Sequence, residues 1–377
     1  MANNEINNHN LRDAKANKKD EFYTTYEDIE AEMNYYYEYN HDVFKDKIIL
    51  CPCDDPEWSE FTRYFVANFK FLGLKKLICT SYVKSSGNNE ISLFEKESPN
   101  FNIEKHKTNG KIFILDNKTS NSTLEYEYLE GDGDFRSEEV TKLRDEADII
   151  ITNPPFSLFR EFMKWIFEAN KQFSIIGNVN AITYKEIFPL IKDNKLWLGN
   201  SIQSGDRKFT VPDDYSLNAS ICGIDKETGK RFIRVKGVRW FTNLDFKNRH
   251  DPKKLSTIKD NLRYNKKLIK KLNSLYSKIE YPHYDNYDAI EVPYSDAIPN
   301  DYNGVMGVPI TFLDKYNPDE FEIIGGFNGY KECDYENSLL CGSVTEYIDK
   351  NGKTKKWRGP TINKKTLYYR ILIKRKG

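Results

Sequence analysis

The chain lacks several features that define common classes of protein. No apolar run approaches the roughly 18 residues that a membrane-spanning helix needs, and the first 22 residues are polar, without the apolar centre of a secretory signal. The six cysteines, at 51, 53, 79, 222, 333 and 341, form no CxxC pair and have no histidine close by. A zinc site is therefore not expected. We expect a reducing, cytoplasmic setting, with no membrane and no metal involved.

The composition indicates a folded protein larger than one ordinary domain. The 377 residues include 39% hydrophobic and 14% aromatic side chains, which supply a sizeable core and exclude a wholly disordered chain. This length predicts one large domain of catalytic size together with a smaller one.

The net charge of zero conceals an uneven distribution of charge. Residues 247–281 hold 11 basic and 3 acidic side chains, and residues 350–377 hold 11 basic and none acidic. The segment between them, 282–349, holds 2 basic and 14 acidic side chains. Two basic blocks indicate a polyanion-binding face, and the competing interpretation is a solvated helix surface with a solubilising tail.

The first two thirds of the chain alternate between short apolar runs and helical patterns. We expect strands at 47–51, 76–80, 147–152 and 173–177, helices at 26–40, 60–72 and 159–169, and a hairpin from 112–115 and 124–128. Strands that alternate with helices in this way indicate βαβ units and a parallel sheet, that is, an α/β fold.

The pattern changes after about residue 245. Asp251-Pro252 resembles a helix start, apolar residues then recur at helical spacing, and Pro282 ends the expected helix. Residues 283–346 are predicted to form loops with short strands, and 366–374 alternate like an edge or closing strand. Residues 1–20 are polar and are expected to form a flexible arm.

One short motif carries chemistry: Asn153-Pro154-Pro155-Phe156, directly after the predicted strand 147–152. Ligands of parallel sheets bind where strands end. Two prolines remove two backbone donors, so carbonyls here are expected to lack ladder partners and to face a ligand. Asn153 adds a side-chain acceptor and Phe156 a flat apolar face. The competing interpretation is a Pro-Pro loop that simply stops a strand.

Such a corner suits a planar group with an exocyclic amine. The amino lone pair of adenine or cytosine is delocalised into the ring, and two acceptors pulling on its N–H bonds favour a pyramidal nitrogen that can attack. Losing one placed dipole of this kind typically lowers the rate by about 10²–10³.

The motif resembles motif IV of S-adenosylmethionine-dependent amino-methyltransferases, and the wider chain resembles the EcoRI-type adenine-specific DNA methyltransferases. Five segments carry the resemblance: residues 19–24 (KDEFYT), 51–56 (CPCDDP), 151–160 (ITNPPFSLFR), 239–243 (RWFTN) and 304–312 (GVMGVPITF). It implies a Rossmann-like class I methyltransferase domain at 21–246 and a C-terminal α+β DNA target-recognition region at 247–377.

The resemblance also implies a cofactor site for S-adenosylmethionine. The residues that it assigns are Phe22, Tyr23 and Thr24 over the methionine end; Pro52, Cys53, Asp54 and Asp55 after the first strand; Thr80, Ser81 and Tyr82 after the second; Asp132, Asp134 and Phe135 at the adenine; and Asn153. The usual glycines after the first strand and the usual ribose-binding acid after the second are missing. Asp54 or Asp55 is expected to pair with the methionine ammonium or to cap the next helix. At the adenine, Asp134 with Phe135 is preferred and Asp132 is the reserve; the alternative is an ordinary Gly-Asp turn.

Double-stranded DNA is the partner that the resemblance implies, with the target adenine flipped out of the duplex. Phosphates are expected to contact Lys259, Arg263, Lys266, Lys267 and Lys270, together with the 350–376 tail. No catalytic cysteine is required. Cytosine-C5 methylation is disfavoured because Cys51 and Cys53 are expected on the cofactor side. The alternatives are an RNA, cytosine-N4 or protein-amide acceptor, or a non-catalytic nucleic-acid-binding module. Whether a cognate restriction endonuclease exists stays open.

Overall fold

The structure is a computed structural model, and it describes residues 24–83, 98–117, 125–203, 206–211, 222–226, 229, 231–327, 334, 339–348 and 353–376. The predicted arm at 1–20 lies outside these residues, as do Phe22 and Tyr23. No described helix is both long enough and apolar enough to cross a membrane. The chain divides into two compact units, 1–179 with 198–246 and 180–197 with 247–377.

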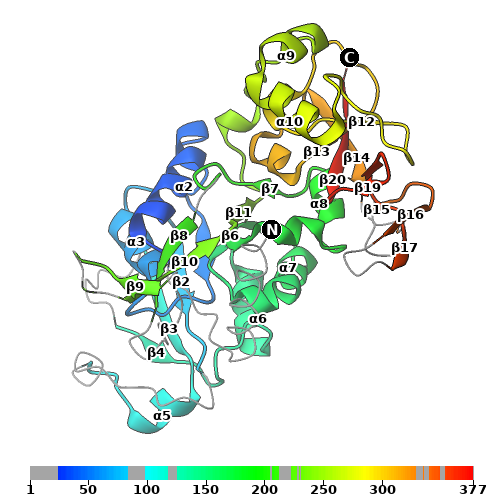
Figure 1. The fold of residues 1–377 in the computed structure, drawn as a ribbon. Coiled ribbons are helices and arrows are strands. Elements are labelled where there is room, and N and C mark those ends of the chain that lie inside the picture. Colours follow the sequence, from blue (N-terminus) through cyan, green and yellow to red (C-terminus); the bar gives the residue numbers. More distant parts are fainter. Residues whose placement is uncertain are drawn as a thin grey trace. The chain divides into compact units, whose positions relative to one another are not determined.

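A mixed sheet of eight strands organises the first unit (Figure 1), in the order β4-β3-β2-β1-β5-β6-β11-β7. The strands are β1 (Ile48–Cys51), β2 (Lys76–Thr80), β3 (Lys111–Asp116), β4 (Glu127–Tyr128), β5 (Ile149–Thr152), β6 (Gln172–Asn178), β7 (Trp197–Leu198) and β11 (Val238–Thr242). The four central strands, β2, β1, β5 and β6, are mutually parallel. The β3–β4 pair is antiparallel, as predicted for the hairpin.

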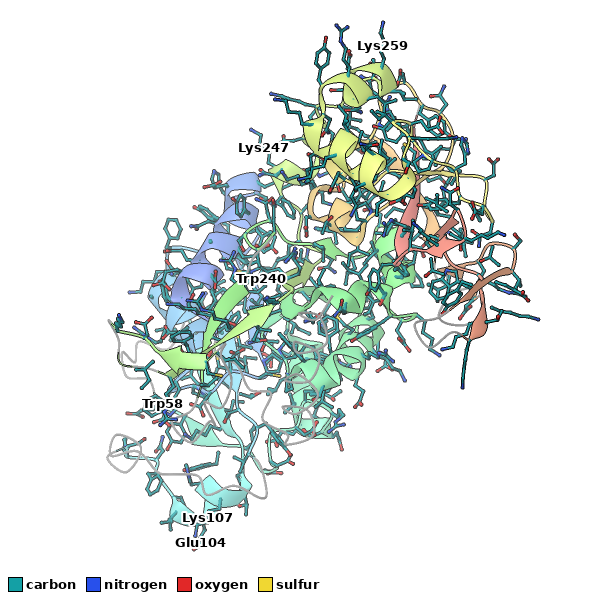
Figure 2. The ribbon with its side chains drawn as sticks, in the orientation of Figure 1. Trp58, Glu104, Lys107, Trp240, Lys247 and Lys259 are labelled. Atoms are coloured by element: carbon teal, nitrogen blue, oxygen red, sulfur yellow. The ribbon has the colours of Figure 1, made fainter. Side chains whose placement is uncertain are left out.

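Helices cover both faces of this sheet. They are α2 (Tyr26–Tyr39), α3 (Glu60–Asn68), α6 (Glu138–Glu146) and α7 (Phe159–Glu168), and the short α5 (Ile103–Thr108) precedes β3. Neighbouring strand residues point to opposite faces. On β11, Trp240 meets Phe61 of α3 and Phe241 meets Phe159 of α7, with ring centroids 6.0 and 5.0 Å apart. Trp240 is labelled inside this unit in Figure 2. The mixed α/β architecture predicted from the alternating pattern is therefore present.

A second, smaller sheet in this unit contains β8 (Asp206–Thr210), β10 (Arg231–Lys236) and β9 (Cys222–Ile224), all antiparallel. It was not predicted.

The second unit is built on a five-stranded sheet in the order β12-β13-β20-β14-β15. Its elements are α8 (Phe188–Lys192), α9 (Ile258–Tyr264), α10 (Lys266–Tyr276), β12 (Ile290–Glu291), β13 (Met306–Val308), β14 (Phe321–Phe327), β15 (Leu339–Leu340), β16 (Thr345–Ile348), β17 (Thr354–Trp357), β18 (Thr361–Ile362), β19 (Lys365–Thr366) and β20 (Arg370–Arg375). The final strand was expected to be an edge or closing strand. The edge position is wrong, because β20 lies between β13 and β14 and pairs with both.

The expected single helix between Asp251 and Pro282 is also wrong. Thr257, not Asp251, is the N-cap of α9, and its hydroxyl accepts from the Asp260 amide. Asn265 ends α9 and at the same time caps α10 by accepting from the Leu268 amide at 3.0 Å. An asparagine that bonds to the backbone in this way favours a cap over a helix interior.

Candidate active site at the carboxyl edge of the sheet

The strand order reverses at β1 in the first unit. From β1 the chain passes through α3 to β2 on one side, whereas β5 lies on the other side and leads through α7 to β6. In open α/β sheets ligands bind outside the carboxyl ends of the strands at such a reversal. The loop after β1 and the motif after β5 meet there.

Asp54 connects the ends of three strands. Its amide donates to the carbonyl of Thr80, the last residue of β2, at 2.9 Å. Its carboxylate accepts from the hydroxyl of Ser59 at 2.7 Å and from that of Thr152, the last residue of β5, at 2.5 Å. The Thr80 hydroxyl donates to the Pro52 carbonyl at 3.2 Å. The predicted residues Pro52, Asp54 and Thr80 are thus brought together.

The Asp54 carboxyl is 6% exposed. Burial raises its pKa to about 7, which the hydroxyls of Thr152 and Ser59 counteract and the neighbouring Asp55 reinforces. Ser59 is the N-cap of α3, so the alternative that Asp54 or Asp55 caps this helix is wrong. Asp55 instead accepts from the Glu57 amide at 2.8 Å.

The Asn153–Phe156 motif begins directly after β5. Asn153 and Phe156 are half-buried, and Pro154 is buried. Pro155 leads into a short 3₁₀ turn at Phe156–Leu158 that continues as α7. The Pro155 carbonyl accepts from the Leu158 amide at 2.9 Å, so this carbonyl is engaged within the turn.

The end of β2 packs against the Gly-Asp segment. Ser81 exchanges two hydrogen bonds with the Lys111 backbone, at 3.0 and 3.1 Å, and the Val83 amide donates to the Asp132 carbonyl at 2.8 Å. Gly133 has φ +83°, and a side chain there would collide with the Ser81 carbonyl. The predicted residues Ser81 and Asp132 are therefore neighbours although 50 residues separate them. Tyr82 beside them is exposed.

Asp134 and Phe135 already have partners within the protein. Arg136 donates to both Asp134 oxygens, at 2.6–2.9 Å, and these hydrogen bonds hold the carboxyl pKa below its usual value. Phe135 is 4% exposed and packs edge-on against Phe162 and Trp165. Little of either side chain is left for a cofactor, which favours Asp132 as the residue nearer to the strand end.

Thr24 precedes α2, whose direction can be read from its contacts. Tyr36 contacts Ser174 near the start of β6, whereas Glu32, one turn earlier, accepts from the amides of Asn200 and Ser201 after β7. Gly199, which precedes Asn200, donates its amide to the Trp240 carbonyl, and Trp240 pairs with Ile176 farther along β6. Glu32 therefore lies nearer than Tyr36 to the carboxyl end of β6. The start of α2 therefore points toward the carboxyl edge. The Thr24 hydroxyl is buried and has no hydrogen-bond partner among the described residues.

Sequence reasoning missed a buried ion cluster beside the end of β2. The Lys111 ammonium is buried, lies 2.5 Å from the Glu57 carboxylate and 3.7 Å from that of Asp55, and stacks over Tyr126 at 4.8 Å. It brings two carboxylates to the strand that lacks the expected acid. No local signal announces this arrangement, because Lys111 reaches it only through the pairing of β3 with β2.

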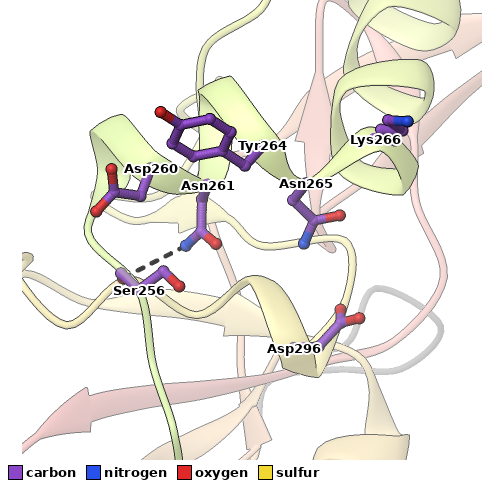
Figure 3. Close-up of a pocket in the computed structure, with 7 residues that line it drawn as sticks. All are labelled: Ser256, Asp260, Asn261, Tyr264, Asn265, Lys266 and Asp296. Carbon is purple, nitrogen blue, oxygen red and sulfur yellow. Dashed lines mark hydrogen bonds between the residues drawn. The ribbon is translucent and has the colours of Figure 1, made fainter.

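The five predicted DNA-contacting residues are exposed on α9 and α10 of the second unit. Lys259 projects from α9 in Figure 2. Arg263 lies over the Tyr264 ring, and Lys267 lies 3.9 Å from the Tyr294 ring centroid. A pocket of about 490 Å³ opens at the junction of the two helices (Figure 3), lined by Ser256, Asp260, Asn261, Tyr264, Asn265, Lys266 and Asp296. Part of the expected basic tail is structural, since Arg370 of β20 is largely buried and paired with Glu291.

Comparisons with known proteins show the family of the chain. The model of the family described as "Adenine-specific methyltransferase EcoRI" matches residues 10–376. The type II methyltransferase M.EcoRI of Escherichia coli is 44% identical over 366 residues, which cover 97% of this chain and 96% of that protein. M.MgeORF184P of Mycoplasma genitalium, also a type II methyltransferase, is 34% identical, covering 97% and 99% of the two chains. No solved structure matches significantly.

These matches place the chain among the methyltransferases. More narrowly, it belongs to the EcoRI adenine-specific methyltransferase family, which confirms the resemblance seen in its motifs.

Proposed function

We propose that the chain is a site-specific DNA methyltransferase of a restriction–modification system that transfers a methyl group from S-adenosylmethionine to adenine N6. One observation carries the proposal: the Asn153–Phe156 motif follows β5 at the order reversal of the sheet, tied through Thr152 to the Asp54 loop. The first unit is then a Rossmann-like class I methyltransferase domain, and the region 247–377 serves target recognition.

The residues at the carboxyl edge fit the cofactor. The buried Asp54 carboxyl holds the loop after β1 in place. The buried Thr24 hydroxyl has no hydrogen-bond partner among the described residues, and Asp55 and Asp132 lie beside the ends of β1 and β2. Oxygen acceptors of this kind suit an ammonium and ribose hydroxyls. When bound, S-adenosylmethionine supplies an electrophilic methyl group on a sulfonium.

The protein's own groups act on the other reactant. An adenine inside a duplex cannot reach Asn153, so it must be flipped out at an expense of a few kcal/mol. Stacking on the half-buried Phe156 ring offsets about 1–3 kcal/mol of this. The Asn153 side-chain oxygen then accepts from the amine and frees its lone pair for in-line attack. No covalent link to the enzyme forms.

Incubation with methyl-labelled cofactor and, separately, duplex DNA, RNA or ribosomal protein tests the acceptor. We expect label only in DNA and, after digestion, only in N6-methyladenine. Sequencing of modified bases in DNA from cells expressing the chain then gives the recognised site. Label in RNA or protein contradicts the proposal.

Substitution of Asn153 tests the catalytic corner. Asn153→Ala removes an acceptor needed only for transfer, so we expect turnover to fall by at least about 10²–10³, with cofactor affinity measured by calorimetry little changed. An active Asn153→Ala enzyme excludes the acceptor role. A wild-type protein that binds DNA but no cofactor supports the alternative of a non-catalytic module.

A further inference from the structure

The small β8–β10–β9 sheet has two chemically different faces. Along β10 the side chains of Ile233 and Val235 are buried, and so is Phe209, which pairs with Ile233. The residues that alternate with them on β10, Arg234 and Lys236, are exposed. Because strand residues alternate, one face of this sheet packs into the first unit and the other faces solvent.

The solvent face is basic and includes an aromatic ring. Arg234 lies directly opposite Lys208 of β8. Both cations lie over the ring of Phe232, with Lys208 Nζ 4.8 Å and Arg234 Cζ 5.8 Å from its centroid. Asp225 pairs with Lys208 at 3.2 Å, and Asp206 lies opposite Lys236 in the ladder.

Like charges directly opposite each other destabilise a sheet by roughly 0.2–1 kcal/mol. The Phe232 ring beneath both cations and the carboxylate of Asp225 offset this repulsion. Closely spaced exposed cations on two paired strands suit a polyanion with regularly spaced charges.

This face adjoins the candidate active site. β10 leads through Gly237, at φ +72°, straight into β11. The Gly237 carbonyl accepts from the Val179 amide at 2.6 Å, and Asn178, the last residue of β6, donates to the Lys236 carbonyl at 3.4 Å. β6 is the neighbour of β5, so the basic sheet starts at the carboxyl edge that also holds Asn153.

We propose that Lys208, Arg234 and Lys236 form a phosphate-binding surface that contacts the sugar–phosphate backbone of duplex DNA beside the target adenine. The inference rests on the proposed function, because it takes DNA as the substrate. It assigns backbone contacts to the methyltransferase unit itself, in addition to those expected from α9 and α10. The contacts are independent of base sequence, since phosphates carry no sequence information.

Salt-dependent binding tests the surface. A fluorescent duplex of mixed sequence is titrated with the full chain between 50 and 200 mM salt. Each lost phosphate contact lowers the slope of log K against log salt by about 0.9, so the triple variant Lys208→Ala/Arg234→Ala/Lys236→Ala is expected to lose about 2.7. Over this salt range wild-type affinity then falls about 40-fold more steeply than that of the variant.

Two further variants exclude a trivial charge effect. Lys45→Ala/Lys70→Ala/Lys75→Ala removes three exposed cations near the amino ends of β1 and β2 and is expected to keep the wild-type slope. Arg234→Lys keeps the positive charge and is therefore also expected to keep the wild-type slope. Circular dichroism and cofactor calorimetry check that each variant is folded.

A triple variant whose slope equals that of the wild type, or a control triple that loses as much, overturns this inference while leaving the methyltransferase function intact. A wild-type protein that binds cofactor but no DNA at any salt concentration overturns the proposed function, and the inference with it. Methyl label entering DNA distinguishes the two cases.

Discussion

At the scale of single residues, Asp54 is the group whose charge state the fold changes most clearly. Its carboxyl sits between the hydroxyls of Ser59 and Thr152 at the strand reversal, where burial raises the pKa from 3.8 to about 7. Between these values the folded protein holds a proton that the unfolded chain has released. The free energy of unfolding therefore falls as pH rises through this window.

This predicts a pH-dependent stability difference. In cofactor-free protein, the free energy of unfolding of the wild type should fall relative to Asp54→Asn by about 1.4 kcal/mol per pH unit between pH 5 and pH 7, and the difference should level off above pH 7. Urea unfolding at pH 5, 6, 7 and 8 measures it. Parallel curves for Asp54→Asn exclude a protonated Asp54.

The residue scale also shows what the sequence can and cannot predict about the site. Asn153 and Asp54 follow apolar strands in a parallel sheet, so their meeting at one edge follows from local pattern. The partners of Lys111 cannot be predicted from local pattern, because Glu57 is 54 positions away in sequence. Asp132 and Asp134 both follow a glycine, and the structure distinguishes them because Arg136, two residues further on, engages the carboxylate of Asp134.

At the scale of elements, α2 is anchored by one buried carboxylate. Glu32 is fully buried and accepts from the Tyr36 hydroxyl at 2.6 Å and from the amides of Asn200 and Ser201 at 3.1 and 2.8 Å. Gly199 packs so closely against it that a side chain there would collide with the carboxylate. This anchor fixes the helix that carries Thr24 toward the carboxyl edge.

We predict that Glu32→Ala lowers the free energy of unfolding by about 3 kcal/mol, because it leaves buried donors without an acceptor. It should also weaken cofactor binding, since Thr24 loses its fixed position. Chemical denaturation and calorimetry with S-adenosylmethionine measure the two effects. Glu30→Ala, exposed on the same helix, should change stability by less than about 0.5 kcal/mol. Equal stability of the two variants contradicts the anchoring role.

Elements were predictable where burial imposes a simple pattern. The strands β1, β2, β5 and β6 are short apolar runs because both faces are covered, and all four were expected. The expected helix after Asp251 failed because its apolar spacing continues through Asn265, and only the capping bonds of Thr257 and Asn265 reveal two helices. The position of β20 in the sheet depends on its pairing with β13 and β14. The alternation of apolar and polar residues predicts a strand but does not indicate its neighbours.

At the scale of the whole molecule, the chain leaves the first unit at residue 179 and returns at 198. The excursion supplies α8 to the second unit. Phe188 of α8 is fully buried and meets Tyr369 with ring centroids 6.1 Å apart. Arg249 stacks on Trp197 at 3.8 Å and donates to the Asn194 side chain. The sequence pattern predicts a domain boundary between residues 246 and 247. Such a boundary separates Phe188, Asn194 and Trp197 from the residues that they contact.

The second unit should therefore fold only when residues 180–197 are present. We predict that the fragment 247–377 alone gives a poorly dispersed NMR spectrum and no cooperative urea transition, because the surface covered by Phe188 is exposed and Arg249 has lost its partners. Residues 180–197 joined to 247–377 by a flexible Gly/Ser linker should restore both signals. The same fusion carrying Phe188→Ser is the matched control and should behave like the fragment alone. Cooperative unfolding of 247–377 by itself would show that the excursion is dispensable, and that the contacts of Phe188 and Arg249 add stability without defining the unit.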